Sequence, residues 1–373
     1  MKKILMVAAL AAMVAGAAPV VEITSVQQEY PWTNTVDITY TSTGITEENT
    51  YYVIFKAQDA SGNEIGVVTN DLKVSQGSTW VAQWQPPFNV RYENCTMTPY
   101  VYKGGMDDYM IVDLETWQVT YELMSEQDAS NKKYNTSDYK TKKLVLRKVE
   151  AGTYTIGDNS ASWDTQHDVS IGKDFYIGIF EVTEGQYNRM LGNNTGYSSM
   201  LPVSNISWIT FRGNSGVNSA PSAGAALALN NKTNMQFDLP TASMWEVAAR
   251  ANTAGNYVNG STSATMLKRY AVFGASAKAN VGSKDPNAWG IYDVTGNVHE
   301  WCRDYAYNGD LKTAQTDGLV AISNGKSSYR VVRGGYYGDN YELAWNTALS
   351  FRQEIASNNL HNGWGFRIAY IKQ

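Results

Sequence analysis

Histidine and cysteine are scarce in this chain of 373 residues, which contains 3 histidines and 2 cysteines. The histidines, His167, His299 and His361, include no i, i+3 or i, i+4 pair, so no helical histidine motif for a metal is present. The cysteines, Cys95 and Cys302, are interpreted as two buried small side chains. An oxidising compartment would also permit a disulfide between them.

Charged residues are also few, at 17% of the chain, whereas hydrophobic residues reach 43%. This composition indicates a globular rather than a disordered protein. The net charge of −5 gives no general attraction to nucleic acid or to a membrane surface. Beyond the N-terminus no segment approaches the roughly 18 consecutive apolar residues of a transmembrane helix. We therefore expect neither a nucleic-acid partner nor an integral membrane segment.

Aromatic residues are abundant, at 12% of the chain with 25 tyrosines and 11 tryptophans. Tyrosine and tryptophan combine an apolar body with a polar tip and are enriched at recognition surfaces. The excess therefore favours a protein that binds another molecule.

Residues 1–18 have the pattern of a cleavable signal peptide. Lys2 and Lys3 precede an apolar run over 4–14, and small residues follow at 15–17. Such a segment directs export and is too short to span a membrane. No cysteine follows the run, so no lipid anchor is indicated, and the mature protein is predicted to be secreted or periplasmic.

The rest of the chain predicts an α+β protein with two domains. Short alternating runs over 19–122 predict an antiparallel β-sandwich of the immunoglobulin or fibronectin kind. Residues 123–143 are polar and rich in lysine, and predict a solvated linker. Residues 144–373 form the second domain.

The second domain mixes strands, helices and irregular chain. Residues 144–157 predict a hairpin. Helices are expected from Glu184, over 223–229, and over 242–251 with Thr241 as N-cap. Glu246 and Arg250 lie four apart on that last helix and predict an ordinary ion pair. From residue 256 onward the pattern is irregular, which favours stabilisation by a metal, a disulfide or a ligand.

Residues 287–302 carry the most informative motif, with two turn glycines, two carboxylates and three large aromatics. Together with other segments in the same order, this motif resembles the formylglycine-generating enzyme (sulfatase-modifying factor) superfamily. Its fold is a variant of the C-type lectin fold. The matching segments are 150–157, 175–187, 201–208, 238–250, 330–335 and 365–367.

The resemblance implies that the family's catalytic copper site is missing. In the enzymes two cysteines between the last two segments bind copper(I), and the corresponding positions here are Asp339 and Ala344. Copper(I) requires soft thiolate ligands, so copper is not expected. Iron, which a related branch binds through histidines, is not expected either, because the histidines here are few and far apart.

A calcium site is predicted in the signature motif. Asp293 and Glu300 supply hard carboxylate oxygens, which suit Ca²⁺. The resemblance implies the same side chains together with the carbonyls of Gly296 and Val298. The alternative is a carboxylate paired with a buried arginine, namely Arg333, Arg352 or Arg367.

The stretch 336–360 is predicted to line a ligand groove, because in the resembling enzymes this region contacts the substrate. Its polar and aromatic side chains suit adaptable recognition, although they would equally serve the domain's own core. The predicted groove residues are Tyr336, Tyr337, Asp339, Asn340, Tyr341, Trp345 and Asn346.

Three functions compete. The first, which we favour, is an exported non-catalytic module, stabilised by calcium, that binds a protein, peptide or glycan. The second is a metal-dependent oxidase that uses iron or copper, in which Asp339 would be the first residue to test. The third is a structural surface or adhesion protein.

Overall fold

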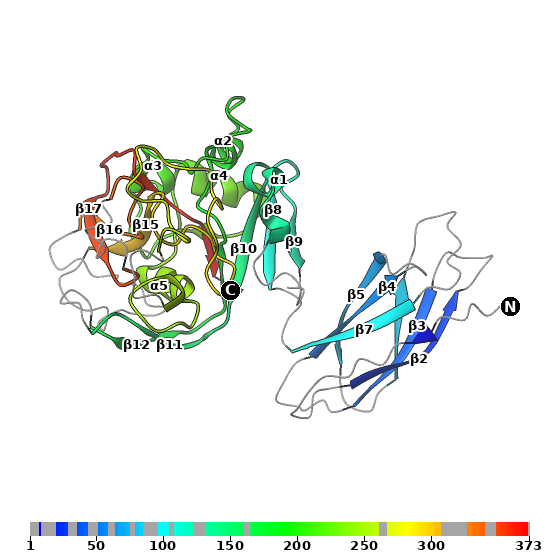
Figure 1. The fold of residues 1–373 in the computed structure, drawn as a ribbon. Helices are drawn as coiled ribbons and strands as arrows, with labels where there is room; N and C mark the ends of the chain where they lie inside the picture. Colours follow the sequence, from blue (N-terminus) through cyan, green and yellow to red (C-terminus); the bar gives the residue numbers. More distant parts are fainter. Residues whose placement is uncertain are drawn as a thin grey trace. The chain divides into compact units, whose positions relative to one another are not determined.

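The chain forms two compact units, Met1–Met106 and Asp107–Gln373, which are described separately (Figure 1). The computed structural model describes residues 7–8, 20–28, 36–43, 51–58, 64–74, 79–84, 96–103, 108–122, 132–159, 165–260, 267–306, 327–339 and 348–371.

Unit 1 contains two β-sheets, with strand orders β2-β3-β6 and β1-β7-β4-β5. The strands are β1 (Val7–Ala8), β2 (Val20–Gln28), β3 (Val36–Thr43), β4 (Tyr51–Gln58), β5 (Glu64–Val74), β6 (Thr79–Trp84) and β7 (Thr96–Lys103). Alternate side chains of β3 are buried, as expected of a strand with one covered face. Tyr40 of β3 contacts Phe55 of β4 with ring centroids 4.8 Å apart, so the two sheets meet. The immunoglobulin or fibronectin topology remains a prediction.

The first unit ends earlier than the sequence indicated. Strands β8 (Tyr109–Asp113) and β9 (Val119–Glu122) pair with each other, and β8 pairs with β10 (Lys143–Val149). They therefore belong to unit 2, whereas the sequence placed residues 107–122 in the first domain. An alternating pattern identifies a strand but not its partner, which is the physical reason for the difference.

The predicted linker 123–143 also contains structure. A 3₁₀ turn, η2, spans Lys132–Tyr134, and helix α1 spans Ser137–Thr141. Lys140 and Thr141 are buried, so this part of the segment contributes to unit 2 rather than to a solvated linker.

Unit 2 is built around an antiparallel sheet with strand order β14-β19-β13-β10-β8-β9. The remaining strands of this sheet are β13 (Phe175–Gly178), β14 (Phe237–Asp238) and β19 (Ala369–Ile371). A separate hairpin pairs β11 (Gly152–Ile156) with β12 (His167–Ile171). The predicted hairpin over 144–157 was wrong, because β10 pairs with β8 and β13 instead.

The three predicted helices are confirmed, and the structure defines their first and last residues. The observed helices are α2 (Glu184–Leu191), α3 (Trp208–Arg212), α4 (Gly224–Thr233) and α5 (Ala242–Arg250), with a 3₁₀ turn η3 at Val258–Gly260. The Thr241 hydroxyl accepts a hydrogen bond from the Met244 N–H and caps α5, as expected. The short helix α3 was not anticipated.

A second sheet, with strand order β17-β16-β15-β18, carries the signature motif. Its strands are β15 (His299–Tyr305), β16 (Tyr329–Arg333), β17 (Arg352–Ala356) and β18 (Trp364–Gly365). Trp301 of β15 lies in one core cluster with Trp208 and Phe366. Cys302 is a free, buried thiol, whereas Cys95 lies outside the described residues. No helix in the described part of the chain is both long and apolar enough to cross a bilayer.

Candidate functional site

Three of the seven predicted groove residues are described, just after β16. These are Tyr336, Tyr337 and Asp339, whereas the predictions for Asn340, Tyr341, Trp345 and Asn346 concern residues outside the described part. The Tyr337 N–H donates to the Asn297 carbonyl at 2.9 Å. The segment is thereby attached directly to the signature motif.

Four rings form what we call the aromatic surface: Tyr336, Tyr337, His361 and Trp364. The Tyr336 ring centroid lies 5.2 Å from that of Tyr337 and 5.4 Å from that of His361, and the His361 and Trp364 centroids are 5.2 Å apart. His361 is exposed and the other three rings are partly exposed. Such rings provide apolar contact area together with polar tips, which suits ligand binding.

Two glycines allow the Tyr336 ring to lie against the backbone. A Cβ at Gly363 would be 2.4 Å from Cδ2 of Tyr336, and one at Gly338 would be 2.6 Å from its Cε2. Both distances are far below van der Waals contact. The observed position of the Tyr336 ring therefore requires glycine at both positions.

His299 lies beneath this surface, beside Asp339. Its Nε2 is 3.8 Å from Oδ2 of Asp339, and the same oxygen accepts a hydrogen bond from the Tyr336 N–H at 2.9 Å. Burial lowers the pKa of His299 to about 4, against the opposing effect of the Asp339 carboxylate. The imidazole is therefore neutral near pH 7.

The sequence did not connect the histidines with each other or with the groove. His299 and His361 are far apart in the chain, yet both rings contact Tyr336, with His299 at a centroid distance of 5.5 Å. The parallel pairing of β15 with β18 brings them together, since His299 is opposite Trp364. Only the occurrence of both histidines within or beside family motifs could have indicated this.

The predicted calcium carboxylate Asp293 is buried and only partly satisfied. Its backbone has a φ of 54°, a left-handed conformation that aspartate tolerates better than most residues. Oδ2 accepts a hydrogen bond from the Gly282 N–H at 2.6 Å. Oδ1 has no hydrogen-bond partner within the described residues. Burial raises the pKa of Asp293 to about 6, although the Gly282 N–H and Arg367 lower it.

The second predicted carboxylate, Glu300, is held by an arginine. Arg367 donates from Nε and from an Nη to the two oxygens of Glu300, each at 2.6 Å. The Trp245 indole donates to Oε2 at 2.8 Å. Of the three arginines considered as alternative partners, the structure selects Arg367.

A third buried carboxylate, Glu181, was missed by the sequence analysis. Its oxygens accept hydrogen bonds from the Asn297 side-chain amide at 2.6 Å and from the Val298 N–H at 2.9 Å. Burial raises the pKa of Glu181 well above its usual range, and Asp293 and Glu300 raise it further. The strand-like run around Glu181 gave no sign of these distant partners.

These groups fit a calcium ion only in part. The unpartnered oxygen of Asp293 suits a hard cation, whereas Glu300 would have to share its oxygens with Arg367. Among the described residues, no group of three or more histidine, cysteine, aspartate or glutamate side chains is arranged to hold a metal ion. Any calcium would therefore depend on Asp293 and on the carbonyls of Gly296 and Val298.

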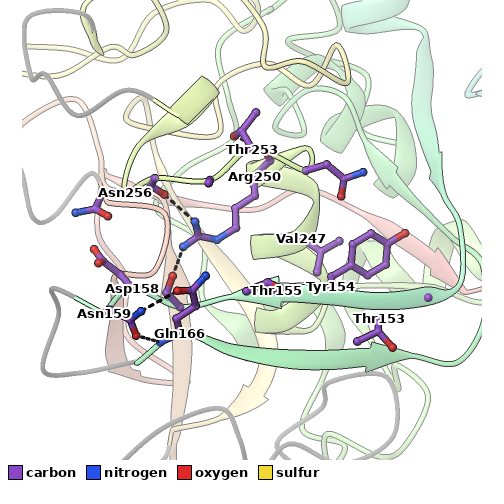
Figure 2. Close-up of a pocket in the computed structure, with 15 residues that line it drawn as sticks. Thr153, Tyr154, Thr155, Asp158, Asn159, Gln166, Val247, Arg250, Thr253 and Asn256 are labelled. Carbon is purple, nitrogen blue, oxygen red and sulfur yellow. Dashed lines mark hydrogen bonds between the residues drawn. The ribbon is translucent and has the colours of Figure 1, made fainter.

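A separate cavity of about 900 Å³ lies between the β11–β12 hairpin and the turn that follows α5. Figure 2 shows Arg250 extending between these two walls. Arg250 donates to the carbonyls of Gly157 and Gly255 at 2.7 and 2.8 Å, and to Glu246 at 2.8 Å. The predicted Glu246–Arg250 pair is therefore confirmed, and it also fixes the cavity walls.

Glu246 joins this pair to a second arginine. It accepts from the Gly157 N–H at 2.8 Å and from Arg333 at 3.0 Å. Although burial alone would raise the pKa of Glu246, Arg333 and Arg250 hold it below its usual range. The charges beneath the cavity are thus paired, and its lining presents mainly neutral hydroxyl and amide groups.

Sequence comparison relates the chain to known proteins over part of its length. Serine/threonine-protein kinase pkn1 of Chlamydia pneumoniae is 31% identical over 134 residues, which cover 35% of this chain and 20% of the kinase. The formylglycine-generating enzyme of Streptomyces coelicolor is 32% identical over 152 residues, which cover 35% of this chain and 46% of that enzyme. The matches thus span less than half of each relative.

Solved structures share the fold. Treponema denticola variable protein 1 is similar with a TM-score of 0.52 at 23% identity, covering 62% of this chain and 96% of that one. PvdO from Pseudomonas aeruginosa is similar with a TM-score of 0.50 at 22% identity, covering 61% and 95%. Residues 130–371 match the family model of the sulfatase-modifying factor enzyme 1-like domain. The chain belongs to the sulfatase-modifying factor enzyme 1-like domain family, as the motifs of its second domain indicated.

Proposed function

We propose that this protein is an exported, non-catalytic binding module whose aromatic surface takes a protein, peptide or glycan ligand. The observation that carries the proposal is the Tyr336 ring, which is fitted between glycines and surrounded by three further rings. A preorganised aromatic group loses little freedom on binding. The aspartate at position 339, where the enzymes have a copper-binding cysteine, supports a role without copper catalysis.

The aromatic surface is tested by Tyr336→Ala. Ligands selected with the full chain from a random-peptide display library and a glycan array are expected to bind the variant at least about tenfold more weakly, as for a central hot-spot residue. Gly363→Ala should have a similar effect, because its Cβ displaces the Tyr336 ring. Titration calorimetry measures both affinities.

The matched control is Tyr329→Ala, which removes an exposed tyrosine of β16 outside the aromatic surface. It should leave the affinity unchanged. Equal affinities of Tyr336→Ala and wild type would contradict the proposal. The absence of any ligand from both libraries would favour the structural or adhesion function instead.

We further propose that Ca²⁺ stabilises the domain through Asp293. The support is Oδ1 of Asp293, which has no hydrogen-bond partner among the described residues. It lies in a cluster where Glu181, Asp293 and Glu300 face Arg367, with Lys140 as a second cation near Asp293. Calcium at about 100 times its dissociation constant adds about 2.7 kcal/mol to the free energy of unfolding. For a domain of this size, the melting temperature should then rise by about 5–10 °C.

Differential scanning calorimetry of chelator-treated protein, with and without Ca²⁺, measures this rise. Asp293→Ala should abolish it. Asp285→Ala, which removes an exposed carboxylate paired with Arg269, should retain it. An equal rise in the Asp293 variant would refute the assignment.

A metal-dependent oxidase is the second candidate, favoured by the neutral His299 beside Asp339. Copper(I) does not fit the described residues, because Cys302 is buried and burial raises the pKa of its thiol well above the usual range. Turnover of a substrate with iron or copper, lost in His299→Ala or His361→Ala, would establish this function and overturn the first.

A further inference from the structure

A second cavity, of about 230 Å³, lies at the edge of the six-stranded sheet where β14 pairs with β19. Its walls come from these strands, from residues 218–221 between α3 and α4, and from single residues of two other elements. At roughly 30 Å³ for each water molecule, the volume suits a ligand of several non-hydrogen atoms. None of the features discussed above uses this cavity.

Two cations line it. Arg303 of β15 is partly buried, and its Nε is buried without a hydrogen-bond partner in the described part of the chain. A guanidinium is always charged, and leaving a buried donor unpaired costs about 1–3 kcal/mol. Lys173, in the turn between β12 and β13, supplies the second positive charge.

The acidic groups around the cavity are already engaged. Asp238, which lines it, accepts a two-pronged pair from Arg212, with both distances 2.7 Å. Asp174, next to Lys173, pairs with Lys148 at 3.2 Å. Asp304, next to Arg303, is fully buried and accepts a hydrogen bond from the Ala242 N–H at 2.7 Å. Neither Asp174 nor Asp304 lines the cavity, and the charge of Asp238 is paired with Arg212. Arg303 and Lys173 therefore leave an excess of positive charge facing the cavity.

Arg212 also makes the cavity rigid. Besides Asp238, it donates to the carbonyls of Gly216 and Ser219, at 3.1 and 2.6 Å. It is fully buried and so joins one wall, the loop before α4, to another, strand β14. Preorganised walls of this kind favour binding because little freedom is lost when a ligand enters.

The remaining lining combines an apolar wall with the polar residues Asn218, Ser219 and Gln236. Phe237, Leu239 and Ala369 are buried and line the cavity with Pro221 and Ile371. A guanidinium binds a carboxylate through two parallel hydrogen bonds, while the apolar wall would cover a short hydrocarbon body. We propose that this cavity binds a small organic carboxylate, with Arg303 and Lys173 holding the carboxylate group and the wall of Phe237 and Leu239 covering its apolar part.

The test is a titration of the full chain, in a buffer free of carboxylates and monitored by NMR. The three probes are sodium butyrate, butyramide and inorganic phosphate. Sodium butyrate should bind saturably. Butyramide, which has the same shape without the charge, should not. Arg303→Gln should weaken butyrate binding at least tenfold, and Lys173→Gln should weaken it less, because Lys173 is more exposed. Arg303→Lys should give an intermediate affinity, since it keeps the charge without the two-pronged donor.

Lys142→Gln is the charge-matched control, because Lys142 is an exposed cation outside the cavity, and it should bind butyrate like the wild type. The Arg303→Gln protein should fold at least as stably as the wild type, since it loses a buried donor that has no partner among the described residues. Equal binding of butyrate and butyramide, or equal affinity of the Arg303→Gln and Lys142→Gln proteins, would overturn the proposal. Saturable binding of inorganic phosphate without butyrate would overturn the carboxylate assignment.

Discussion

An Arg367→Met protein is expected to lose about 3–5 kcal/mol of its free energy of unfolding, because the change leaves buried carboxylates without their counter-charge. Arg367 is the bidentate partner of Glu300, and it also donates to the carbonyls of Gly178 and Tyr292, at 2.8 and 3.0 Å. The substitution removes all of these bonds from a site closed to water. For a domain of this size, the loss corresponds to a melting temperature lower by about 6–20 °C.

Urea denaturation of the full chain, monitored by near-ultraviolet circular dichroism, measures this loss in the unfolding of unit 2. The double variant Glu300→Gln, Arg367→Met should be less destabilised than the single variant, because the unpaired charge of Glu300 is removed with its partner. A single variant within 1 kcal/mol of wild type would show that the carboxylates are neutralised in another way.

Gly296→Ala is expected to lower the free energy of unfolding by about 2–6 kcal/mol. Gly296 has a φ of 78°, where an alanine is strained by about 1–3 kcal/mol. The new Cβ would lie 2.3 Å from the Val272 carbonyl oxygen, and relieving such overpacking costs a further 1–3 kcal/mol or so. The backbone of the signature motif would have to move to accommodate it.

Gly274→Ala separates these two contributions. Gly274 also has a positive φ, of 61°, but nothing lies within 4 Å of its Cβ position. Its replacement should therefore cost only the backbone strain, at the low end of the range for a left-handed residue. Equal losses for the two glycines in the same urea denaturation would show that the Val272 contact carries no energy.

Local signals in the sequence predicted local structure well. The helix starts at Glu184 and after Thr241 were predicted correctly, because an N-cap such as Thr241 needs only its own first turn. The alternation over residues 36–40 predicted β3 for the same reason. Matching the family motifs in order identified the family of unit 2.

Signals that depend on distant partners were missed. The sequence could not show that β8 and β9 pair with β10, nor that Glu181 accepts hydrogen bonds from Asn297 and Val298. The choice of Arg367 rather than Arg333 for Glu300 depends on the final packing, since Arg333 pairs with Glu246 instead. Each of these outcomes is set by contacts between segments well separated in the chain.

The place of β19 in the sheet has a consequence for the order of events during folding. β19 (Ala369–Ile371) lies between β14 and β13 rather than at an edge. The sheet therefore remains split, with the edges of β13 and β14 unpaired, until β19 has joined it. Strand pairing over such separations is slow, and unpaired edges favour association between chains. Unit 2 should thus complete this sheet only when β19 has paired with both of its neighbours.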